Sequence, residues 1–598
     1  MLIQKNEELI EKLEDQVNNE IKSIVMKLDA EKLLIFLLMQ QELMFSTLEH
    51  KKPGNKEILA ESFSYTINII KHYKKINPKK LQNYNISVYI EQQKETLKLL
   101  VSLLLVKSKI TDFKIYVSKQ GYALNIDNNV LTITHQIQNY IKYYKLGYLR
   151  NVMEDVFLSM MSFQNNDSNF IKVVQKAYEQ KLPFFEIMNK DTSLERIRYK
   201  WSEPLFQILT DIGDHNSEYK MYSAYSQYFS NSDVEINNTC YKSTNIRWID
   251  LLKFSIGISN AVIFMDNTLK ENCKEDSIMF NNSILFPAPD NLVFDLIKLV
   301  FSQINKNITD KDIRSFINKF TTDLTKSKRD DRLDIQFKPI VKVHDNFNFF
   351  LFRTFGATNL VRAYLSTYQM GLDEQGNKFE EIVKNLFMKY FSDVRNGLKF
   401  VNQNGEKGEI DICILGDKNI YFIECKNRLH PISATSATNN YEYIIKASKE
   451  QLPKAVDYFN LDRNAFIKRY FNKNIEDISN YKSFQVVMLS NRNVSGLNID
   501  EVAIRDVYSL ERILEVGYAQ KGYTSKTDHE KFEDTAEKIY FWKNRTSFQE
   551  TDLVDYLAPN SRFFNSLEEI AIQQERNYEY NEYIFRDFVY AYTAYEER

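Results

Sequence analysis

Apolar residues recur every three or four positions through most of the first 330 residues, and this spacing predicts amphipathic α-helices. The first such run begins with Leu9, Ile10 and Leu13 and continues through positions 17, 21, 24 and 28. The stretch Leu33–Phe45 is apolar on nearly every side, which is typical of a helix in a domain core. We therefore expect residues 1–330 to form a large, mostly α-helical accessory region.

Alternation of polar and apolar residues replaces the helical spacing at two places. Between residues 113 and 135, Asn128-Asn129 separates two alternating runs, which predicts a small β-hairpin. The run Ile335–Phe352 is also rich in strand-forming residues. We place it in a strand-rich transition segment at residues 331–371.

The rest of the chain changes its pattern twice. Residues 372–522 show the order helix, hairpin, helix, strand, helix, which indicates an α/β domain. Residues 523–598 return to a helical spacing, so we expect a helical C-terminal segment. The predicted fold class is multidomain, with a helical N-terminal region, an α/β core and a helical tail.

Composition sets limits on this picture. The chain has 598 residues, of which 43% are hydrophobic and 26% charged, as in ordinary folded proteins. A formal net charge of only -2 means that any nucleic-acid-binding surface must be local. The apolar runs Leu33–Met39 and Leu97–Val106 are shorter than the roughly 20 residues of a spanning helix. Because Glu7 and Glu8 interrupt any signal pattern, we expect a cytoplasmic protein with no membrane partner.

The four cysteines do not suggest a metal or disulfide framework. They are Cys240, Cys273, Cys413 and Cys425, and no two form a C-x-x-C pair. Neither a zinc knuckle nor a set of disulfides is therefore indicated.

The segment Gly408–Asn427, GEIDICILGDKNIYFIECKN, predicts a tight hairpin with charged residues inside apolar runs. A turn with Asp417-Lys418 as its two loop residues sets Asp411 opposite Glu424, and Glu409 opposite Lys426. Alternation places these four charged residues on one face. An exposed hairpin would also show alternation, but the run 420–423 (Ile-Tyr-Phe-Ile) is apolar on both faces and predicts a strand covered on both sides.

Two opposed carboxylates in such a strand pair need a cation. Directly opposite residues have Cβ atoms roughly 4.5–5.5 Å apart, so Asp411 and Glu424 would repel each other strongly. A hard divalent cation such as Mg²⁺ prefers carboxylate oxygens and keeps waters, one of which can act as a nucleophile. The charged face is therefore a predicted metal site with Lys426 beside it.

At this point the sequence resembles the PD-(D/E)xK nuclease superfamily, which has a restriction-endonuclease-like core. The resemblance rests on Asp411 followed across a hairpin by Glu424-Cys425-Lys426, and it covers roughly residues 376–514. It implies an α/β domain with a mixed central sheet at residues 372–522. The family's proline before its aspartate is Ile410 here.

The resemblance also implies roles for residues outside the hairpin. The first core helix of the family often carries a G-x-x-F-E pattern, which Gly376, Phe379 and Glu380 match. Glu380 borders the apolar face of this predicted helix, whereas Glu381 points towards solvent. Some branches carry a glutamine on the helix after the E-x-K strand, and Gln451 matches it, although Pro453 interrupts that helix.

By this resemblance, Asp411, Glu424 and the carbonyl of Cys425 would hold Mg²⁺, for which Mn²⁺ should substitute. Glu380 would hold a second ion or a bound water. Lys426 would orient the attacking water and stabilise the charge of the transition state. Gln451 completes the expected catalytic set.

The expected activity is metal-dependent endonucleolytic hydrolysis of phosphodiester bonds, with DNA rather than RNA as the substrate. A large accessory region on a free-standing nuclease suggests bacterial genome or anti-phage defence by analogy. The N-terminal helices would recognise a substrate, sense a trigger, or bind a protein partner or a second copy. Two alternatives stay open: a ribonuclease with the same site, and a non-catalytic nucleic-acid-binding scaffold.

Basic residues follow the predicted site. They are interleaved with Tyr458, Phe459 and Tyr470, a mixture that suits contact with phosphates and stacking on bases. A solvated helix in a lysine-rich protein has the same appearance. The residues concerned are Lys446, Lys449, Lys454, Arg463, Lys468 and Arg469.

Overall fold

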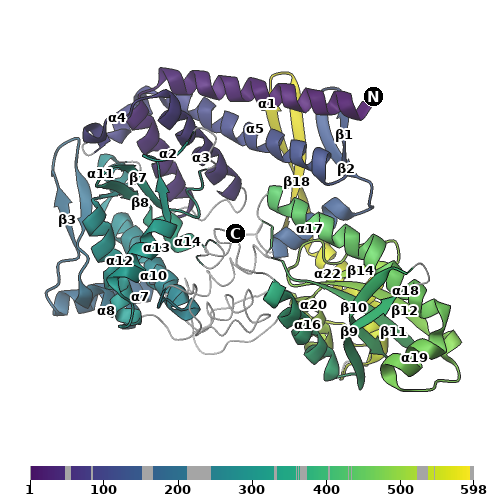
Figure 1. Cartoon of the computed structure of the whole chain (residues 1–598). Helices are drawn as coiled ribbons and strands as arrows, with labels where there is room; N and C mark the ends of the chain where they lie inside the picture. The colour runs from purple at the N-terminus through teal and green to yellow at the C-terminus, as the bar shows by residue number, and fades with distance from the viewer. Residues whose placement is uncertain are drawn as a thin grey trace. The chain divides into compact units, whose positions relative to one another are not determined.

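The computed structural model shows a large mixed α/β protein with 54% helix and several sheets (Figure 1). The structure describes residues 2–46, 56–81, 85–150, 166–211, 244–275, 277–328, 333–358, 360, 363, 373–401, 405–428, 430–431, 434–521, 537–544 and 546–592. The chain forms two compact units. Unit 1 comprises Met1–Ile3, Asp112–Asp155 and Gly371–Arg598, and unit 2 comprises Gln4–Thr111 and Val156–Met370.

This division differs from the one expected from sequence. Residues 112–155 were expected in the helical accessory region, yet they belong with the C-terminal part of the chain. The strand-rich segment at 331–371 lies almost wholly in unit 2. Periodicity reports local structure and carries no information on which distant segments share a core. It therefore could not show that residues 112–155 belong with the C-terminal part of the chain.

Unit 2 is mainly helical, as the apolar spacing predicts. Its helices, two of which extend slightly beyond it, are α1 (Leu2–Lys27), α2 (Ala30–Met44), α3 (Lys56–Tyr73), α4 (Ile86–Gln92), α5 (Lys94–Lys119), α7 (Asn166–Glu179), α8 (Glu203–Asp211), α10 (Trp248–Asn272), α11 (Ile278–Ser283), α12 (Asp290–Ile304), α13 (Asp310–Lys319) and α14 (Phe352–Ala357). The apolar run in α2 is a core helix, because every residue from Leu33 to Met39 is buried. Among the described helices, only α10 is long and apolar enough to cross a membrane, and 61% of its apolar window is buried inside the protein.

Two small sheets complete unit 2. One pairs β3 (Phe185–Met188) with β4 (Arg196–Tyr199). The other has the order β5-β8-β7-β6 and contains the strand-rich run predicted from sequence. Its strands are β5 (Phe286–Ala288), β6 (Thr321–Asp323), β7 (Ile340–His344) and β8 (Phe347–Phe350).

A buried ion network joins three of the helices of unit 2. The fully buried Arg353 of α14 donates from Nε to Asp266 of α10 at 2.7 Å. Glu42 of α2 accepts the backbone N–H groups of Arg353 and Thr354 at 3.0 and 2.8 Å. Burial, opposed by the nearby Arg353, raises the pKa of Glu42 to about 7. A buried carboxylate is costly unless it is paired, which accounts for this arrangement.

Unit 1 is built around a six-stranded mixed sheet with the order β13-β14-β12-β11-β10-β9. Antiparallel pairs join β9 to β10 and β10 to β11, and parallel pairs join β11 to β12 and β12 to β14. The strands are β9 (Asp393–Val401), β10 (Lys407–Leu415), β11 (Asn419–Lys426), β12 (Lys482–Leu489), β13 (Asn498–Ile499) and β14 (Val502–Asp506). Sequence periodicity did not predict β9.

Helices cover both faces of this sheet (Figure 1). Phe391, just beyond α16, packs on Tyr421 of β11, whereas Phe459 of α18 packs on the next residue, Phe422, which points to the other face. The strand is therefore covered on both sides, as its apolar run predicts. The helices and helical turns of this part are α16 (Asp373–Met388), α17 (Ala434–Lys446), a π turn at Ala447–Gln451, α18 (Leu452–Leu461), α19 (Arg463–Phe471), α20 (Val507–Glu511) and a π turn at Arg512–Val516.

The predicted helical C-terminal segment is wrong in its last part. It contains α21 (Glu550–Leu557) and α22 (Arg562–Glu569), but then forms the long hairpin of β17 (Ala571–Tyr580) and β18 (Tyr583–Tyr592). The predicted hairpin near residues 113–135 is confirmed as β1 (Tyr122–Asp127) and β2 (Val130–His135). β18 pairs in parallel with β2, giving the sheet β1-β2-β18-β17. A further short sheet joins β15 (Tyr518–Lys521) and β16 (Glu537–Tyr540).

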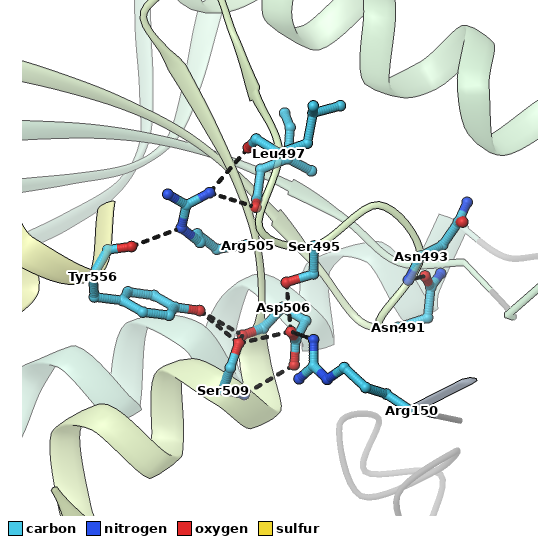
Figure 2. A network of polar contacts seen from close by, with 10 residues as sticks. Arg150, Asn491, Asn493, Ser495, Leu497, Arg505, Asp506, Ser509 and Tyr556 are labelled. Carbon is cyan, nitrogen blue, oxygen red and sulfur yellow. Dashed lines mark hydrogen bonds and ion pairs between the residues drawn. The ribbon is translucent and has the colours of Figure 1, made fainter. Parts of the chain in front are cut away.

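A buried polar network fastens the C-terminal helices to the six-stranded sheet (Figure 2). Arg505 of β14 is fully buried and donates to the carbonyls of Tyr556 and Leu557 in α21 at 2.9 and 2.8 Å. The neighbouring Asp506 accepts from Ser495 and Ser509 and pairs with Arg150 at 3.2 Å. The six-stranded sheet, the described residues 112–150 and the C-terminal helices thus share one folded unit.

Candidate active site

The hairpin has the register predicted from sequence. Ile412 pairs with Ile423 and Leu415 with Ile420, and the N–H of Gly416 donates to the carbonyl of Asn419 across a two-residue loop. Continuing this register by one pair sets Asp411 opposite Glu424. A slip of one residue would have moved Asp411 to the other face of the sheet.

The two strands stop pairing through their backbones at Asp411. There the Oδ2 atom of Asp411 accepts a hydrogen bond of 2.8 Å from the backbone N–H of Cys425. In a strand the N–H and C=O of one residue point to the same side, so the Cys425 carbonyl also faces β10. The carbonyl of the following residue, Lys426, points the opposite way and accepts the N–H of Ser490 beyond β12. Asp411 and the Cys425 carbonyl therefore lie at the same point, where β10 and β11 part.

Lys426 and Gln451 both contact Glu424. The ammonium of Lys426 donates to Glu424 Oε1 at 2.6 Å, and the Gln451 side chain hydrogen-bonds the same carboxylate. The sequence placed Lys426 beside Glu409. The backbone pairing of β10 with β11 ends at Ile412 and Ile423, before this pair is reached, and the ammonium of Lys426 bonds to Glu424.

The helix that carries Gln451 accommodates Pro453 through a π turn. Proline has no N–H and its ring collides with the carbonyl four residues earlier, so an ordinary α-helix is unfavourable there. The turn Ala447–Gln451 widens the helix, and the N–H of Leu452 bonds to the carbonyl of Ala447, five residues back. Such π turns often occur at functional sites. The interruption therefore does not remove Gln451 from the site.

Glu380 approaches the hairpin from α16. Phe379 and Val383 of this helix are fully buried, Glu380 is half-buried, and Glu381 is exposed. Burial, together with the charges of Glu409 and Glu424, raises the pKa of Glu380. The predicted helical phase is thus confirmed, and Glu380 lies close enough to the other carboxylates to feel their charge.

Three carboxyl groups gather at the point where the strands part. Burial, with the neighbouring charges of Glu424 and Glu380, raises the pKa of Asp411 to about 8. Burial also raises the pKa of Glu424, even though Lys426 and Gln451 favour its ionised form. The one ammonium at Lys426 does not balance three carboxyl groups, so a bound cation would stabilise the site.

The donor set fits Mg²⁺ rather than a soft metal. Within the described ranges, no three histidine, cysteine or carboxylate side chains already stand close enough to enclose an ion. Mg²⁺ commonly takes only one or two carboxylates and completes its shell with waters and phosphate oxygens of the substrate. Asp411, Glu424 and the Cys425 carbonyl supply oxygen ligands of that kind. Cys273, Cys413 and Cys425 are free thiols, and Cys240 lies outside the described residues.

One basic residue near the site was not singled out by the sequence analysis. Arg428 follows Lys426 by two residues, and its guanidinium carbon lies 3.8 Å from the centre of the Tyr443 ring in α17. Its backbone is held by Ser490, whose hydroxyl accepts the Arg428 N–H at 2.9 Å, and by Asn491, which donates to its carbonyl at 2.8 Å. The sequence did contain a signal for this residue, since Arg428 follows the predicted catalytic lysine, Lys426, by only two positions.

Comparison with known proteins gives no relative for this chain. No family model, no curated protein and no solved structure matches it. The case for a function therefore rests on the geometry of the residues described above.

Proposed function

We propose that this protein is a metal-dependent endonuclease of the PD-(D/E)xK type, which hydrolyses phosphodiester bonds with Mg²⁺. The observation that carries the proposal is the point where β10 and β11 part. There Asp411 bonds the Cys425 N–H, and Glu424 contacts both Lys426 and Gln451. An aspartate, a glutamate and a lysine at the divergence of two strands, beside a glutamate from the preceding helix, is the arrangement that the sequence resemblance implies.

Each residue has a distinct chemical task in this proposal. Asp411, Glu424 and the Cys425 carbonyl hold Mg²⁺, which supplies Lewis-acid polarisation of the phosphodiester and a water of lowered pKa. Lys426 orients the attacking water and stabilises the negative charge that develops on the phosphoryl oxygens. Gln451 keeps the Glu424 carboxylate in position. Glu380 accepts a hydrogen bond from a bound water or holds a second ion.

The surrounding fold supports this reading. Helix α16 is followed by three antiparallel strands, by helices α17 to α19 and then by β12, which pairs in parallel with β11. This restriction-endonuclease-like order gives a mixed sheet covered on both faces. DNA is the proposed substrate, and a role in bacterial anti-phage defence follows only by analogy with free-standing nucleases.

The alternatives differ in what they predict for RNA and for metals. A ribonuclease with the same site would need the 2′-hydroxyl or the shape of RNA for cleavage. A non-catalytic scaffold would bind nucleic acid but would form no cleavage product, with or without Mg²⁺. No observation on the described residues favours either of them over a DNA endonuclease.

The test is a substrate panel. Purified protein is incubated with plasmid, linear duplex, single-stranded DNA and RNA in Mg²⁺, Mn²⁺ or EDTA. We expect nicked or linear plasmid with either metal and none in EDTA. Cleavage of RNA alone would establish the ribonuclease, and binding without cleavage in any metal would establish the scaffold.

A further inference from the structure

The segment after β11 carries a cation that the catalytic scheme does not use. The guanidinium carbon of Arg428 lies over the Tyr443 ring, 3.8 Å from its centre, and a guanidinium that stacks on a ring keeps its N–H donors free to bind a ligand. Among the ion pairs formed by described residues, none involves Arg428, whereas Lys426 is paired with Glu424. The Arg428 charge thus remains uncompensated close to the proposed catalytic lysine.

Its backbone is fixed before any ligand arrives. The Ser490 hydroxyl accepts the Arg428 N–H and also donates to the Arg428 carbonyl, at 2.9 and 3.1 Å. The Asn491 amide donates to the same carbonyl at 2.8 Å. Because both residues follow β12 directly, the end of this central strand sets the position of Arg428. A cation held in this way loses little conformational entropy on binding.

The π turn places Tyr443 and Gln451 on the same side of one continuous helix. They are eight positions apart, one more than the seven that make about two helical turns. The π turn at Ala447–Gln451 takes up the extra residue. Gln451 contacts Glu424 of β11, and Tyr443 lies under Arg428, which follows the end of β11 by two residues. The same helix therefore contacts Glu424 through Gln451 and Arg428 through Tyr443.

We infer that Arg428, stacked on Tyr443, binds a backbone phosphate of the nucleic acid strand adjacent to the bond that is cut. This inference rests on the proposed nuclease function. Arginine suits a phosphate, because its planar fork of N–H donors matches the phosphate oxygens while its face stays on the ring. The contact does not read sequence and serves to set the strand in register with Lys426.

The test measures binding separately from cleavage. Fluorescein-labelled oligonucleotides, single-stranded and duplex, are titrated with the full chain in EDTA, and their anisotropy is recorded at several salt concentrations. Arg428→Gln should weaken binding roughly tenfold. It should also lower the slope of log affinity against log salt by about 0.7–0.9, which corresponds to one lost phosphate contact. Tyr443→Phe should bind like the wild type, and Tyr443→Leu should lose part of the affinity.

Arg314→Gln is the matched control. Arg314 also lies over an aromatic ring, with its guanidinium carbon 4.5 Å from the centre of the Phe294 ring, but it belongs to α13 in unit 2. We expect this variant to keep wild-type affinity and salt slope. An equal loss in both variants would show a diffuse basic surface and overturn the inference, as would unchanged binding by Arg428→Gln.

Failure of the proposed function has a different signature. If the wild type binds oligonucleotides but cuts none in Mg²⁺, the nuclease proposal fails while the effect of Arg428→Gln on binding still decides the phosphate contact. If the wild type binds no nucleic acid, the inference fails outright. Thermal melts of each variant show that a loss of affinity does not come from unfolding.

Discussion

Two adjacent glutamates of α16 have different surroundings, and this difference allows a sharp test of the site. Glu380 is half-buried beside the hairpin carboxylates, whereas Glu381 is exposed. We predict that Glu380→Gln lowers Mg²⁺-dependent cleavage at least tenfold, since it removes a charged ligand or a water acceptor. Glu381→Gln, the matched control, should leave the rate within about twofold. Plasmid cleavage rates measure both, and the reverse order would mean that Glu381 is the residue at the site.

Glu42 links the stability of unit 2 to pH. Its folded pKa of about 7 lies above its ordinary value of 4.5, so the folded state binds the proton more tightly than the unfolded state. Stability must then fall as pH rises from 4.5 to 7, and become independent of this group above 7. The slope can reach about 1.4 kcal/mol per pH unit.

Glu42→Gln should remove this dependence, because the amide has no proton to lose. We predict that the melting temperature of the variant, relative to the wild type, rises between pH 5 and 7 (the window set by the pKa of Glu42) and then stays level. Thermal melts in a series of buffers measure this difference. A difference that is the same at every pH would show that Glu42 is ionised at low pH in the folded state.

At the level of elements, the turn of the β10–β11 hairpin is held by a helix from far along the chain. Glu550, at the start of α21, accepts the Asp417 N–H at 2.9 Å and the side chains of Asn419 and Tyr421 at 2.8 Å each. A side chain at position 416 would displace this carboxylate, since a Cβ there would lie 2.0 Å from Glu550 Oε1. The hairpin is therefore fixed at its turn as well as along its strands.

We predict that Glu550→Ala destabilises unit 1 by about 1–3 kcal/mol, because three donors lose one acceptor. Glu550→Gln keeps one carbonyl oxygen and should cost less. Chemical denaturation monitored by circular dichroism gives both values. Equal stability of Glu550→Ala and the wild type would show that water replaces the carboxylate without cost.

The sequence predicted the hairpin well because its signals are local. The loop Asp417-Lys418 and the alternation of charged and apolar residues at the outer ends of the two strands define the register without help from other segments. Glu380 followed from the match of its helix to the G-x-x-F-E pattern of the family, and the phase of that helix separated it from Glu381. These are the parts of the site in which neighbours in sequence determine the structure.

Elements that depend on distant partners were missed. Asn396-Gly397 in β9 resembles a turn, and Gly397 does have a positive φ of 64°, yet pairing with β10 keeps it in a strand. The run 571–580 contains Gln, Glu and Arg, which favour helices, but it pairs with β18 and so joins the sheet of β2. Tertiary pairing outweighs local preference in both cases.

At the level of the molecule, unit 1 needs segments from three parts of the chain. The buried Asp506 pairs with Arg150, and Arg505 donates to carbonyls of α21. Removing these partners would leave the buried Asp506 without its counter-charge and several Arg505 N–H donors without acceptors. The loss of folding free energy would be several kcal/mol in total. The site therefore lies in a domain that extends well beyond the α/β segment recognisable from sequence.

We predict that a fragment of residues 371–521 does not fold cooperatively, although it contains every proposed catalytic residue. Its melt, followed by circular dichroism, should be broad, and it should be digested by protease much faster than unit 1 in the full chain. A sharp melt with protection from protease would contradict this prediction. It would show that the network around Asp506 contributes little to the stability of the sheet.

The most direct test of the central claim compares the wild type with Asp411→Asn in a plasmid cleavage assay containing Mg²⁺. Asparagine keeps the size of the side chain and an oxygen that can accept the Cys425 N–H, but it removes the charge that would bind the metal. The account predicts cleavage by the wild type, a loss of at least a hundredfold in the variant, and an unchanged melting temperature in EDTA. Cleavage by Asp411→Asn at the wild-type rate would contradict it.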